Sequence, residues 1–420
     1  VCGRVTDASL VVGPAAWHFG WAADDWDRLA GAVVAGHVLE CGAQATGGNY
    51  AFLDELPDRR QPGFPVAEVR DDGSAVVTKH PGSGGLVSIG TVTAQLLYEI
   101  DGPAYANPDV VARFDTVRVE QQGPDRVLLH GARGEPAPER LKVAINYLGG
   151  FRNSMSFVLT GLDVEAKAAM VEAALFERLG GRERFRAAEV RLVGRPAPDP
   201  ATAEEAVAEL RVTVKDPDPA KVGRAFSNAA IELALASYPG CYTTTPPGDA
   251  TPYGVYWPAL VRADAVEQVV VLDGGERLVV KPPTAPARPP GPTPPAPPPG
   301  PVPAGPTVRA PLGRAFGARS GDKGGNANVG VWARDPEGYA FLASFLTVDR
   351  LRALLPETRG LQVRRHELPN LLALNFVVVG LLGEGVSSST RIDPQAKGLG
   401  EWLRARVVDL PVALVEQQGG

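Results

Sequence analysis

Several features that mark specialised protein classes are scarce in this sequence of 420 residues. Its three cysteines, Cys2, Cys41 and Cys241, have no Cys-x-x-Cys spacing, which argues against a disulfide framework and a structural zinc site. Its five histidines show no metal-ligand spacing, so we expect no metal site. No apolar run reaches the roughly 18–20 residues that span a bilayer. We therefore expect a cytoplasmic protein without a membrane span.

Charge of one sign is not concentrated either. The 42 Lys and Arg residues stand against 48 Asp and Glu residues, which gives a formal net charge of −6. Without a dense basic stripe we expect no binding to nucleic acid. The sequence starts at Val1 and its first methionine is Met155, so we expect the natural start to lie upstream.

Proline marks the clearest domain boundary. Residues 282–306 contain 14 prolines among 25 residues, a composition that favours an extended polyproline II spacer over a packed core. The predicted parts are a main body at 1–281, a linker at 282–308 and a C-terminal domain at 309–420. A linker of this length lets the C-terminal domain dock on its own main body or on a neighbouring subunit, and we expect a homo-oligomer.

The predicted fold class is α/β and α+β, in three parts. Residues 1–150 read as an α/β part with glycine-rich loops, and residues 151–281 follow the order β-α-β-β-α-β of a ferredoxin-like fold. Residues 309–420 read as a small α+β domain of order ββαββα. The predicted helices are 25–39, 86–100, 163–179, 219–236, 348–355 and 395–407, and the predicted strands are 67–70, 75–79, 126–130, 141–147, 154–160, 188–193, 209–214, 267–272, 313–318, 328–333, 361–365 and 373–379.

The first candidate site is the segment Gly36–Gly48, where a predicted helix runs into a glycine-containing loop. His37 and Glu40 lie one turn apart on one helix face, so Glu40 can orient the imidazole of an acid/base pair. Cys41 is a candidate nucleophile if its pKa is lowered. The alternative is a capped helix end in which Cys41 is a small buried residue. The candidates here are His37, Glu40 and Cys41 for catalysis and Gln44 and Thr46 for substrate binding.

The second candidate site is Thr78–Gly85, which leads into a helix predicted to begin near Leu86. Unpaired N–H groups at a helix N-terminus suit a phosphate or a carboxylate. The alternative is a turn whose glycines serve geometry alone. The candidates are His80 for catalysis and Lys79, Ser83 and Gly84 for substrate binding.

The third candidate site is Ala318–Asn328, between two predicted strands of the C-terminal domain. It is longer than a hairpin connection needs to be. It is suited to binding an anionic substrate or to closing over a site on the main body, and the alternative is a solvated hairpin tip. The candidates are Arg319, Asp322, Lys323 and Asn326.

Together these segments resemble the acyclic terpene utilization protein A (AtuA) family. The resemblance is carried by GHVLECGAQATGGN at Gly36–Asn49, DGSAVVTKHPGSGGLVS at Asp72–Ser88 and RSGDKGGNANVG at Arg319–Gly330, with further matches at Val1–Ala8 and Gln95–Tyr105. It implies a C-terminal ferredoxin-like domain and a setting beside acyl-CoA carboxylases in terpenoid breakdown. The family pattern extends further toward the N-terminus than this sequence does.

The function expected from the sequence is an enzyme of acyl-CoA or branched-chain and terpenoid carboxylate catabolism. Lyase or hydratase chemistry fits best, because it needs a base and oxyanion donors without a redox cofactor, and the sequence has no dinucleotide fingerprint. The expected partner is an acyl-CoA or carboxylate substrate, and no cofactor is expected. Two alternatives are a non-catalytic subunit that binds an acyl-CoA carboxylase and a protein that binds acyl thioesters or terpenoids without chemistry.

Overall fold

The computed structural model describes residues 5–282, 302–303 and 305–416, so most of the expected proline-rich linker lies outside the described residues. The chain forms two compact units. The first comprises Val1–Ala144, Pro258–Val386 and Asp393–Gly420, and the second comprises Ile145–Trp257 and Ser387–Ile392. The N-terminal part and the C-terminal domain therefore belong to one unit.

The N-terminal part of the first unit combines helices with antiparallel sheets. Its strands are ordered β1-β2-β6-β5 in one sheet and β3-β4-β7 in another, with antiparallel registers. The mixed α/β composition is confirmed, while α1, β3, β4, β5 and β7 have no counterpart among the predicted elements. The elements are α1 Val12–Phe19, α2 Trp26–Leu39, β1 Pro65–Val69, β2 Ala75–Lys79, α3 Ile89–Leu96, β3 Ala104–Ala106, β4 Val110–Arg113, β5 Arg118–Gly123, β6 Arg126–His130 and β7 Arg133–Pro136.

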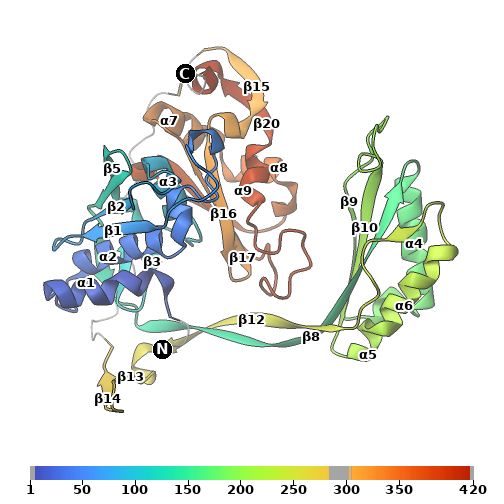
Figure 1. Ribbon diagram of the computed structural model, residues 1–420, viewed down its shortest axis with the longest axis horizontal. Coiled ribbons are helices and arrows are strands. Elements are labelled where there is room, and N and C mark those ends of the chain that lie inside the picture. The colour runs from blue at the N-terminus through green and yellow to red at the C-terminus, as the bar shows by residue number, and fades with distance from the viewer. Residues whose placement is uncertain (1–4, 283–301, 304, 417–420) are drawn as a thin grey trace. The chain divides into compact units, whose positions relative to one another are not determined.

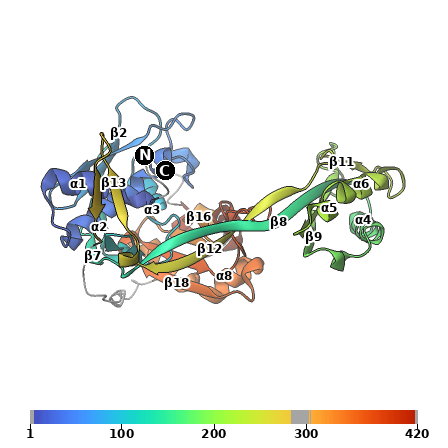
Figure 2. The same cartoon turned by 90° about the horizontal axis from the view of Figure 1, so that it is seen from below.

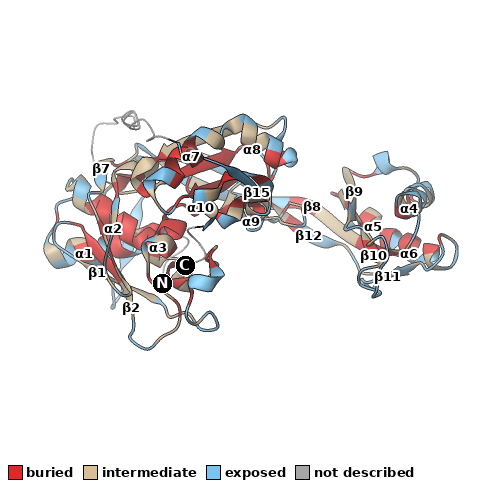
Figure 3. Cartoon of the chain, turned by 90° about the horizontal axis from the view of Figure 1, so that it is seen from above, coloured by how far each residue is buried: buried red, intermediate tan, exposed pale blue. Residues whose placement is uncertain are grey.

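Helix α2 is buried along most of its length (Figure 3). Every residue from Leu29 to Val38 is buried, as expected for a helix that is apolar all round. Two glycines allow other backbone segments to approach it closely. A Cβ atom on Gly31 would lie 2.0 Å from the carbonyl oxygen of Gly73, and one on Gly36 would lie 1.9 Å from that of Ala8. This close packing fixes the end of the helix that carries the first candidate segment.

The C-terminal domain is built on the antiparallel sheet β16-β17-β19-β18. The predicted order ββαββα is present, and β15, α7, β20 and α10 are additional elements. Strand β15 pairs with β20. The elements are β15 Thr307–Pro311, β16 Gly317–Lys323, β17 Asn326–Trp332, α7 Pro336–Phe345, α8 Val348–Leu354, β18 Val363–Leu368, β19 Ala373–Val378, α9 Leu399–Arg404, β20 Val407–Pro411 and α10 Val412–Glu416.

Strands β16 and β17 form a tight hairpin, so the prediction of a long loop over 318–328 is wrong. Lys323 pairs with Asn326, and only Gly324 and Gly325 make the turn, a glycine pair that suits a two-residue connection. The candidate residues therefore stand on strands. The strands of the hairpin pack against α3 (Figure 1), and the turn residues Gly324 and Gly325 are half-buried.

One hydrophobic core joins the C-terminal domain to the N-terminal part. Trp332, Leu368 and Ala373 belong to the cluster that also contains the buried residues of α2. The rings of Tyr50 and Phe52 each lie with their centroids 6.3 Å from that of Trp332. The C-terminal domain is therefore packed into the first unit.

The second unit has the expected β-α-β-β-α-β order with one correction. Its sheet is ordered β11-β8-β10-β9, with β12 also paired to β8, and helices α4, α5 and α6 lie beside it (Figure 2). The fourth strand is β11, whereas the predicted strand at 267–272 forms β13, which pairs with β14 in the first unit. The elements from residue 140 to residue 262 are β8 Arg140–Thr160, α4 Val164–Arg178, β9 Ala187–Val193, β10 Val207–Asp216, α5 Pro219–Val222, α6 Arg224–Glu232, β11 Tyr242–Thr243 and β12 Thr251–Arg262, and the hairpin of the first unit consists of β13 Gln268–Val271 and β14 Arg277–Val280.

Strand β8 is continuous over 21 residues, whereas the sequence predicts two separate strands at 141–147 and 154–160. Gly149 lies between the two predicted strands. A Cβ atom there would lie 2.5 Å from the side chains of Tyr253 and Val255. The glycine therefore permits close approach of these side chains and does not break the strand.

Helix α4, with 15 residues, is the longest helix of the described residues. None of the helices there is both long and apolar enough to cross a membrane. The same residues contain no group of three or more His, Cys, Asp or Glu side chains placed to hold a metal ion.

Candidate functional site

Two of the three candidate segments meet in the first unit, around the turn that follows α3. The end of α2 contributes Glu40 and Cys41, and the turn contributes Glu99. The charges of Glu40, Asp322 and Lys323 all act on the Glu99 carboxyl group. We call the following group the acid–base cluster: Glu40, Cys41, Glu99, Asp322, Lys323 and Lys397.

The turn that carries Glu99 is held by two buried asparagines. The sequence predicts a helix through Ile100, but α3 stops short of it and Glu99 has a φ of +54°. Such a left-handed conformation costs about 1–2 kcal/mol for a residue with a side chain. Asn328 holds it, because its Oδ1 accepts from the Glu99 N–H at 2.8 Å and its Nδ2 donates to the Leu97 carbonyl at 2.9 Å. Asn375 donates to the carbonyl of Ile100 at 3.3 Å.

Two glycines of the hairpin allow its backbone to lie against this turn. A Cβ atom on Gly321 would lie 2.6 Å from the Tyr98 ring and 2.9 Å from Cγ of Glu99. One on Gly330 would lie 2.5 Å from Cβ of Leu97. A glycine inside a strand often marks such a close approach. Gly321 and Gly330 of RSGDKGGNANVG therefore serve the contact with the Glu99 turn.

The acid–base cluster contains three carboxyl groups with raised pKa values. Burial, with the charge of Asp322 adding to it, raises the pKa of Glu99 to about 7 even though Lys397 Nζ lies 2.9 Å away. Burial also raises the pKa of Glu40 and of Asp322, while Lys323 opposes each shift. A carboxyl group that titrates near neutral pH, as Glu99 does, can both accept and deliver protons there.

Cations and aromatic rings surround these acids. Lys323 Nζ lies 5.0 Å from the ring centroid of Tyr105, and the Arg319 guanidinium and Lys397 Nζ lie 4.4 and 4.5 Å from that of Tyr98. Burial lowers the pKa of Lys323 and of Lys397. Among the described residues Lys323 forms no ion pair. Its ammonium group is available to an anionic ligand.

Cys41 is a thiol in this environment. Its Sγ donates to Glu40 Oε1 at 3.0 Å. Burial and the Glu40 carboxylate raise the pKa of Cys41 to about 12, so the nucleophilic thiolate is disfavoured at neutral pH. The arrangement does not support the expected nucleophile and instead makes Cys41 a hydrogen-bond donor to Glu40.

His37 lies in the hydrophobic core, with 2% of its surface exposed. Its ring centroid is 5.2 Å from that of Tyr105 and 5.3 Å from that of Phe114. Burial lowers the pKa of His37 to about 3, and the charge of Lys323 adds to the shift. The expected pair with Glu40 is not formed, because the imidazole is neutral and packed among rings while Glu40 bonds to Cys41.

The polar groups of the second candidate segment are bonded to one another and to close neighbours. Lys79 Nζ donates to the Ser83 carbonyl at 2.8 Å and forms an ion pair with Asp125 at 3.1 Å. The Ser83 hydroxyl donates to the His80 carbonyl at 2.6 Å, and the Gly84 carbonyl accepts a backbone hydrogen bond at 3.0 Å. The His80 side chain is exposed.

The expected anion cradle at this loop is not formed. Helix α3 begins at Ile89 and not near Leu86, and Ser88 caps its first turn with a side-chain hydrogen bond. The N–H group of Val87 donates to Asp125 Oδ1 at 2.8 Å. The protein itself therefore occupies the N–H groups that an anion would need.

The remaining candidates have different surroundings. Thr46 is fully buried, with Oγ1 within hydrogen-bond distance of the carbonyls of Ala43 and Gly63. Oδ1 of Asn326 accepts from the N–H group of Gly380 at 2.9 Å. Both side chains therefore stabilise loops. Gln44 lies nearer the cluster and accepts a hydrogen bond from the Arg319 guanidinium, which also donates to the Asn49 carbonyl at 3.1 Å.

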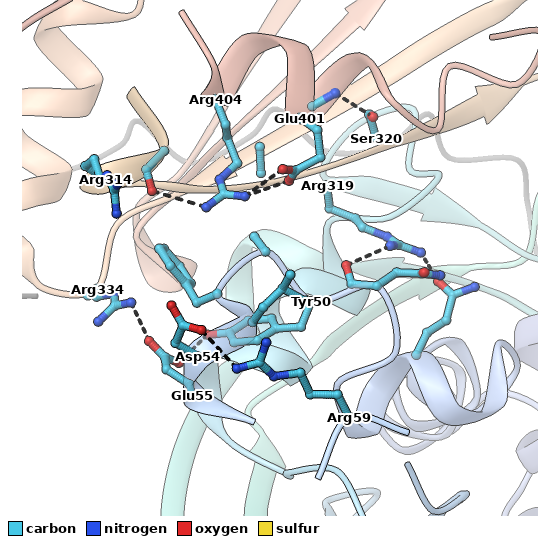
Figure 4. Close-up of a pocket in the computed structure, with 18 of the residues that line it drawn as sticks. Tyr50, Asp54, Glu55, Arg59, Arg314, Arg319, Ser320, Arg334, Glu401 and Arg404 are labelled. Atoms are coloured by element: carbon cyan, nitrogen blue, oxygen red, sulfur yellow. Dashed lines mark hydrogen bonds and ion pairs between the residues drawn. The ribbon is translucent and has the colours of Figure 1, made fainter. Parts of the chain in front are cut away.

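A groove of about 1280 Å³ lies beside the cluster in the first unit (Figure 4). Residues 49–55 form one side of it, and residues of β16 and α9 form the other. Six cationic side chains face three anionic ones, so the groove favours an anionic ligand. The charged residues that line it are Asp54, Glu55, Arg59, Arg314, Arg319, Arg334, Lys397, Glu401 and Arg404.

The sequence reasoning missed Glu99, Tyr98 and Lys397. Helical spacing placed Tyr98 and Glu99 inside a helix predicted to run to Ile100, and Lys397 inside one predicted over 395–407. One signal was present, because the turn-forming residues Asp-Gly-Pro at 101–103 follow directly and mark the end of a helix.

Comparison with family models matches residues 1–272 to "Acyclic terpene utilisation family protein AtuA" and residues 310–409 to the AtuA ferredoxin-like domain. Comparison with curated proteins finds no match, and comparison with solved structures finds none either. Glu40 and Glu99 fall in the first matched range, and Asp322, Lys323 and Lys397 fall in the second. The chain belongs to the acyclic terpene utilisation AtuA family and carries the AtuA ferredoxin-like domain at its C-terminal end.

Proposed function

We propose that this chain is an enzyme of acyl-CoA or branched-chain and terpenoid carboxylate catabolism that performs lyase or hydratase chemistry. One observation carries the proposal: three carboxyl groups with raised pKa values lie beside Lys323, an ammonium group without an ion pair in the described residues. Membership of a family linked to acyclic terpene utilisation supports the metabolic setting.

Both reactions require the same three kinds of group. In a hydratase, a base takes a proton from water as its oxygen bonds to the β-carbon, and an acid delivers a proton to the α-carbon. In a lyase, a base takes the proton of a β-hydroxyl group, the bond between the α- and β-carbons breaks, and the resulting enolate is protonated. In both cases a cation near the thioester oxygen stabilises the charge that develops there.

The acid–base cluster supplies one residue for each task. Glu99, with a pKa of about 7, is the base, because an appreciable fraction is ionised at neutral pH. Glu40, whose carboxyl group accepts a hydrogen bond from the Cys41 thiol, is the second proton-transfer group of the cluster. Lys323 holds the developing oxyanion or a substrate carboxylate. His37 takes no proton in this scheme and supports the ring of Tyr105.

The test is turnover of a panel of branched-chain and terpenoid acyl-CoA thioesters by the full chain and its variants. Glu99→Gln and Glu40→Gln keep the side-chain shape but remove the proton-transfer group, so each lowers kcat by about a hundredfold or more. Glu337→Gln, an exposed glutamate in the first turn of α7, is the matched control and keeps wild-type turnover.

Full turnover in Glu99→Gln would remove Glu99 from the mechanism. If the wild-type chain turns over no thioester and co-purifies with an acyl-CoA carboxylase, and if that association persists in Glu40→Gln and Glu99→Gln, the non-catalytic alternative is correct.

A further inference from the structure

The groove beside the acid–base cluster has an excess of positive charge on its rim. Arg59 pairs with Asp54 at 2.9 Å, and Arg334 pairs with Glu55. Both pairs are solvent-exposed, and such pairs contribute little to stability. A phosphate group can therefore replace the carboxylate partners, because charge-assisted hydrogen bonds to phosphate are among the strongest available to arginine.

Two arginines of the groove are placed to contact a phosphate, one without a partner in the described residues and one in an exposed ion pair. Arg314 is exposed and has no hydrogen bond or ion pair within the described part of the chain. The Arg334 guanidinium stacks 4.0 Å from the ring centroid of Phe52, which fixes its plane, while its edge is held by the exposed ion pair with Glu55 that a phosphate can replace. Arg404 differs, since it donates to both oxygens of Glu401 and to the Gly313 carbonyl (Figure 4), and also to the Phe316 carbonyl. It is a fixed part of the wall.

The groove is continuous with the acid–base cluster through two residues. Lys397 lines the groove, and its Nζ lies 2.9 Å from the Glu99 carboxyl group. Arg319 also lines the groove and lies over the ring of Tyr98. A ligand that is anchored at Arg314 and passes Lys397 and Arg319 therefore extends toward Glu99, the proposed base.

The volume and charge fit a long ligand with one highly anionic end. About 1280 Å³ exceeds the roughly 300–1,000 Å³ typical of pockets for drug-sized ligands. A CoA thioester has a nucleotide end with three phosphates and a long, nearly neutral arm that ends at the thioester. We propose that the groove binds the phosphorylated nucleotide end of CoA, with Arg314, Arg334 and Arg59 as its phosphate contacts and the arm directed to Glu99. This inference rests on the proposed acyl-CoA function.

The test is the affinity of the full chain for CoA, measured by titration calorimetry. Arg314→Gln and Arg334→Gln each weaken CoA binding by about tenfold, because each removes a charge-assisted contact. Arg309→Gln is the matched control, since this exposed arginine of β15 does not line the groove, and it keeps wild-type affinity. CoA that lacks its 3′-phosphate binds more weakly than CoA, and pantetheine binds equally to all variants.

Thermal unfolding shows whether each variant is folded, and the exposed position of Arg314 keeps that variant native. The proposal is overturned if Arg314→Gln and Arg334→Gln bind CoA as Arg309→Gln does. It is also overturned if inorganic phosphate binds as tightly as CoA.

Failure of this inference and failure of the proposed function look different. If an acyl-pantetheine and the matching acyl-CoA are turned over with equal kcat/KM, and Glu99→Gln abolishes both activities, the proposed enzyme chemistry is correct and the proposed nucleotide site is wrong. If CoA binding depends on Arg334 while Glu99→Gln keeps full turnover, the proposed nucleotide site is correct and the proposed acid/base chemistry is wrong.

Discussion

The Lys79–Gly85 loop and the β16–β17 hairpin have similar compositions but different surroundings. Each combines glycines with a lysine and a serine. Lys79 is buried and paired with Asp125, whereas Lys323 forms no ion pair in the described residues and lies in the acid–base cluster. The lysine of the loop contributes to local structure, and the lysine of the hairpin remains free to bind a ligand.

The glycines of the two segments also differ in purpose. Gly82 has a φ of +76°, and a Cβ atom there would meet nothing within 4 Å, so this glycine serves the turn conformation. Gly321 has no positive φ, and its Cβ atom would collide with Tyr98. Glycine content alone therefore does not separate a turn from a close contact between distant parts of a chain.

The largest effect expected on the hairpin side comes from Asn328→Ala. Asn328 is fully buried, and its loss leaves the Glu99 N–H and the Leu97 carbonyl without a partner. Each buried unpaired group costs about 1–3 kcal/mol, so we expect a loss of about 3 kcal/mol in the free energy of unfolding, measured by urea denaturation. Turnover falls as well, because the Glu99 turn loses its support.

Asn326→Ala is the control for this variant. Its side chain accepts from Gly380 beside the hairpin turn, away from Glu99, so it loses less stability and keeps turnover. An Asn328→Ala protein as stable and active as Asn326→Ala would show that the turn holds its conformation without the asparagine.

A smaller effect is expected from Lys79→Met. The substitution removes the ion pair with Asp125 and the hydrogen bond to the Ser83 carbonyl, while Asp125 keeps the N–H group of Val87. We expect a loss of about 1–2 kcal/mol in stability and unchanged kcat and KM. The matched variant is Lys323→Met, which loses turnover without losing stability, because the half-buried charge it removes has no ion-pair partner in the described residues. If a fully stable Lys79→Met protein loses turnover, the Lys79–Gly85 loop takes part in substrate binding after all.

Much of the fold could be predicted because local patterns agree with it. The apolar run of α2 and the β-α-β-β-α-β order of the second unit follow directly from hydrophobic spacing and helix-capping residues. The exception is the run at 267–272, which forms a strand as predicted but pairs with β14 and not with the sheet of the second unit. The partner of a strand depends on the rest of the chain and not on its own residues.

The candidate site was predictable only in part, because one side of it is created by tertiary contacts. The residues Glu40, Asp322 and Lys323 stood in segments that combine glycine with reactive side chains, which sequence reasoning can identify. Glu99 did not stand in such a segment. Its left-handed conformation is imposed by Asn328, which lies more than 200 positions away in the chain. No local pattern at Glu99 encodes that contact.

A pH dependence of stability isolates the contribution of the Glu99 carboxyl group. Its pKa is about 7 in the folded chain and near 4.5 when unfolded, so between these values the folded state holds a proton that the unfolded state releases. This proton stabilises the fold at low pH, and the stabilisation is lost as pH rises from about 4.5 to about 7. Glu99→Gln lacks this contribution.

The measurement is the difference in melting temperature between wild type and Glu99→Gln from pH 5 to pH 8. His37 acts in the opposite direction, because its lowered pKa means that acid protonates the unfolded state first, but it is present in both proteins and cancels in the difference. We expect the melting temperature of the wild type to fall relative to that of Glu99→Gln as pH rises. A melting-temperature difference that stays constant would mean that Glu99 titrates at its ordinary pKa. A wild type that becomes more stable than Glu99→Gln as pH rises would mean that the ion pair of Glu99 with Lys397 outweighs the effect of burial on its pKa.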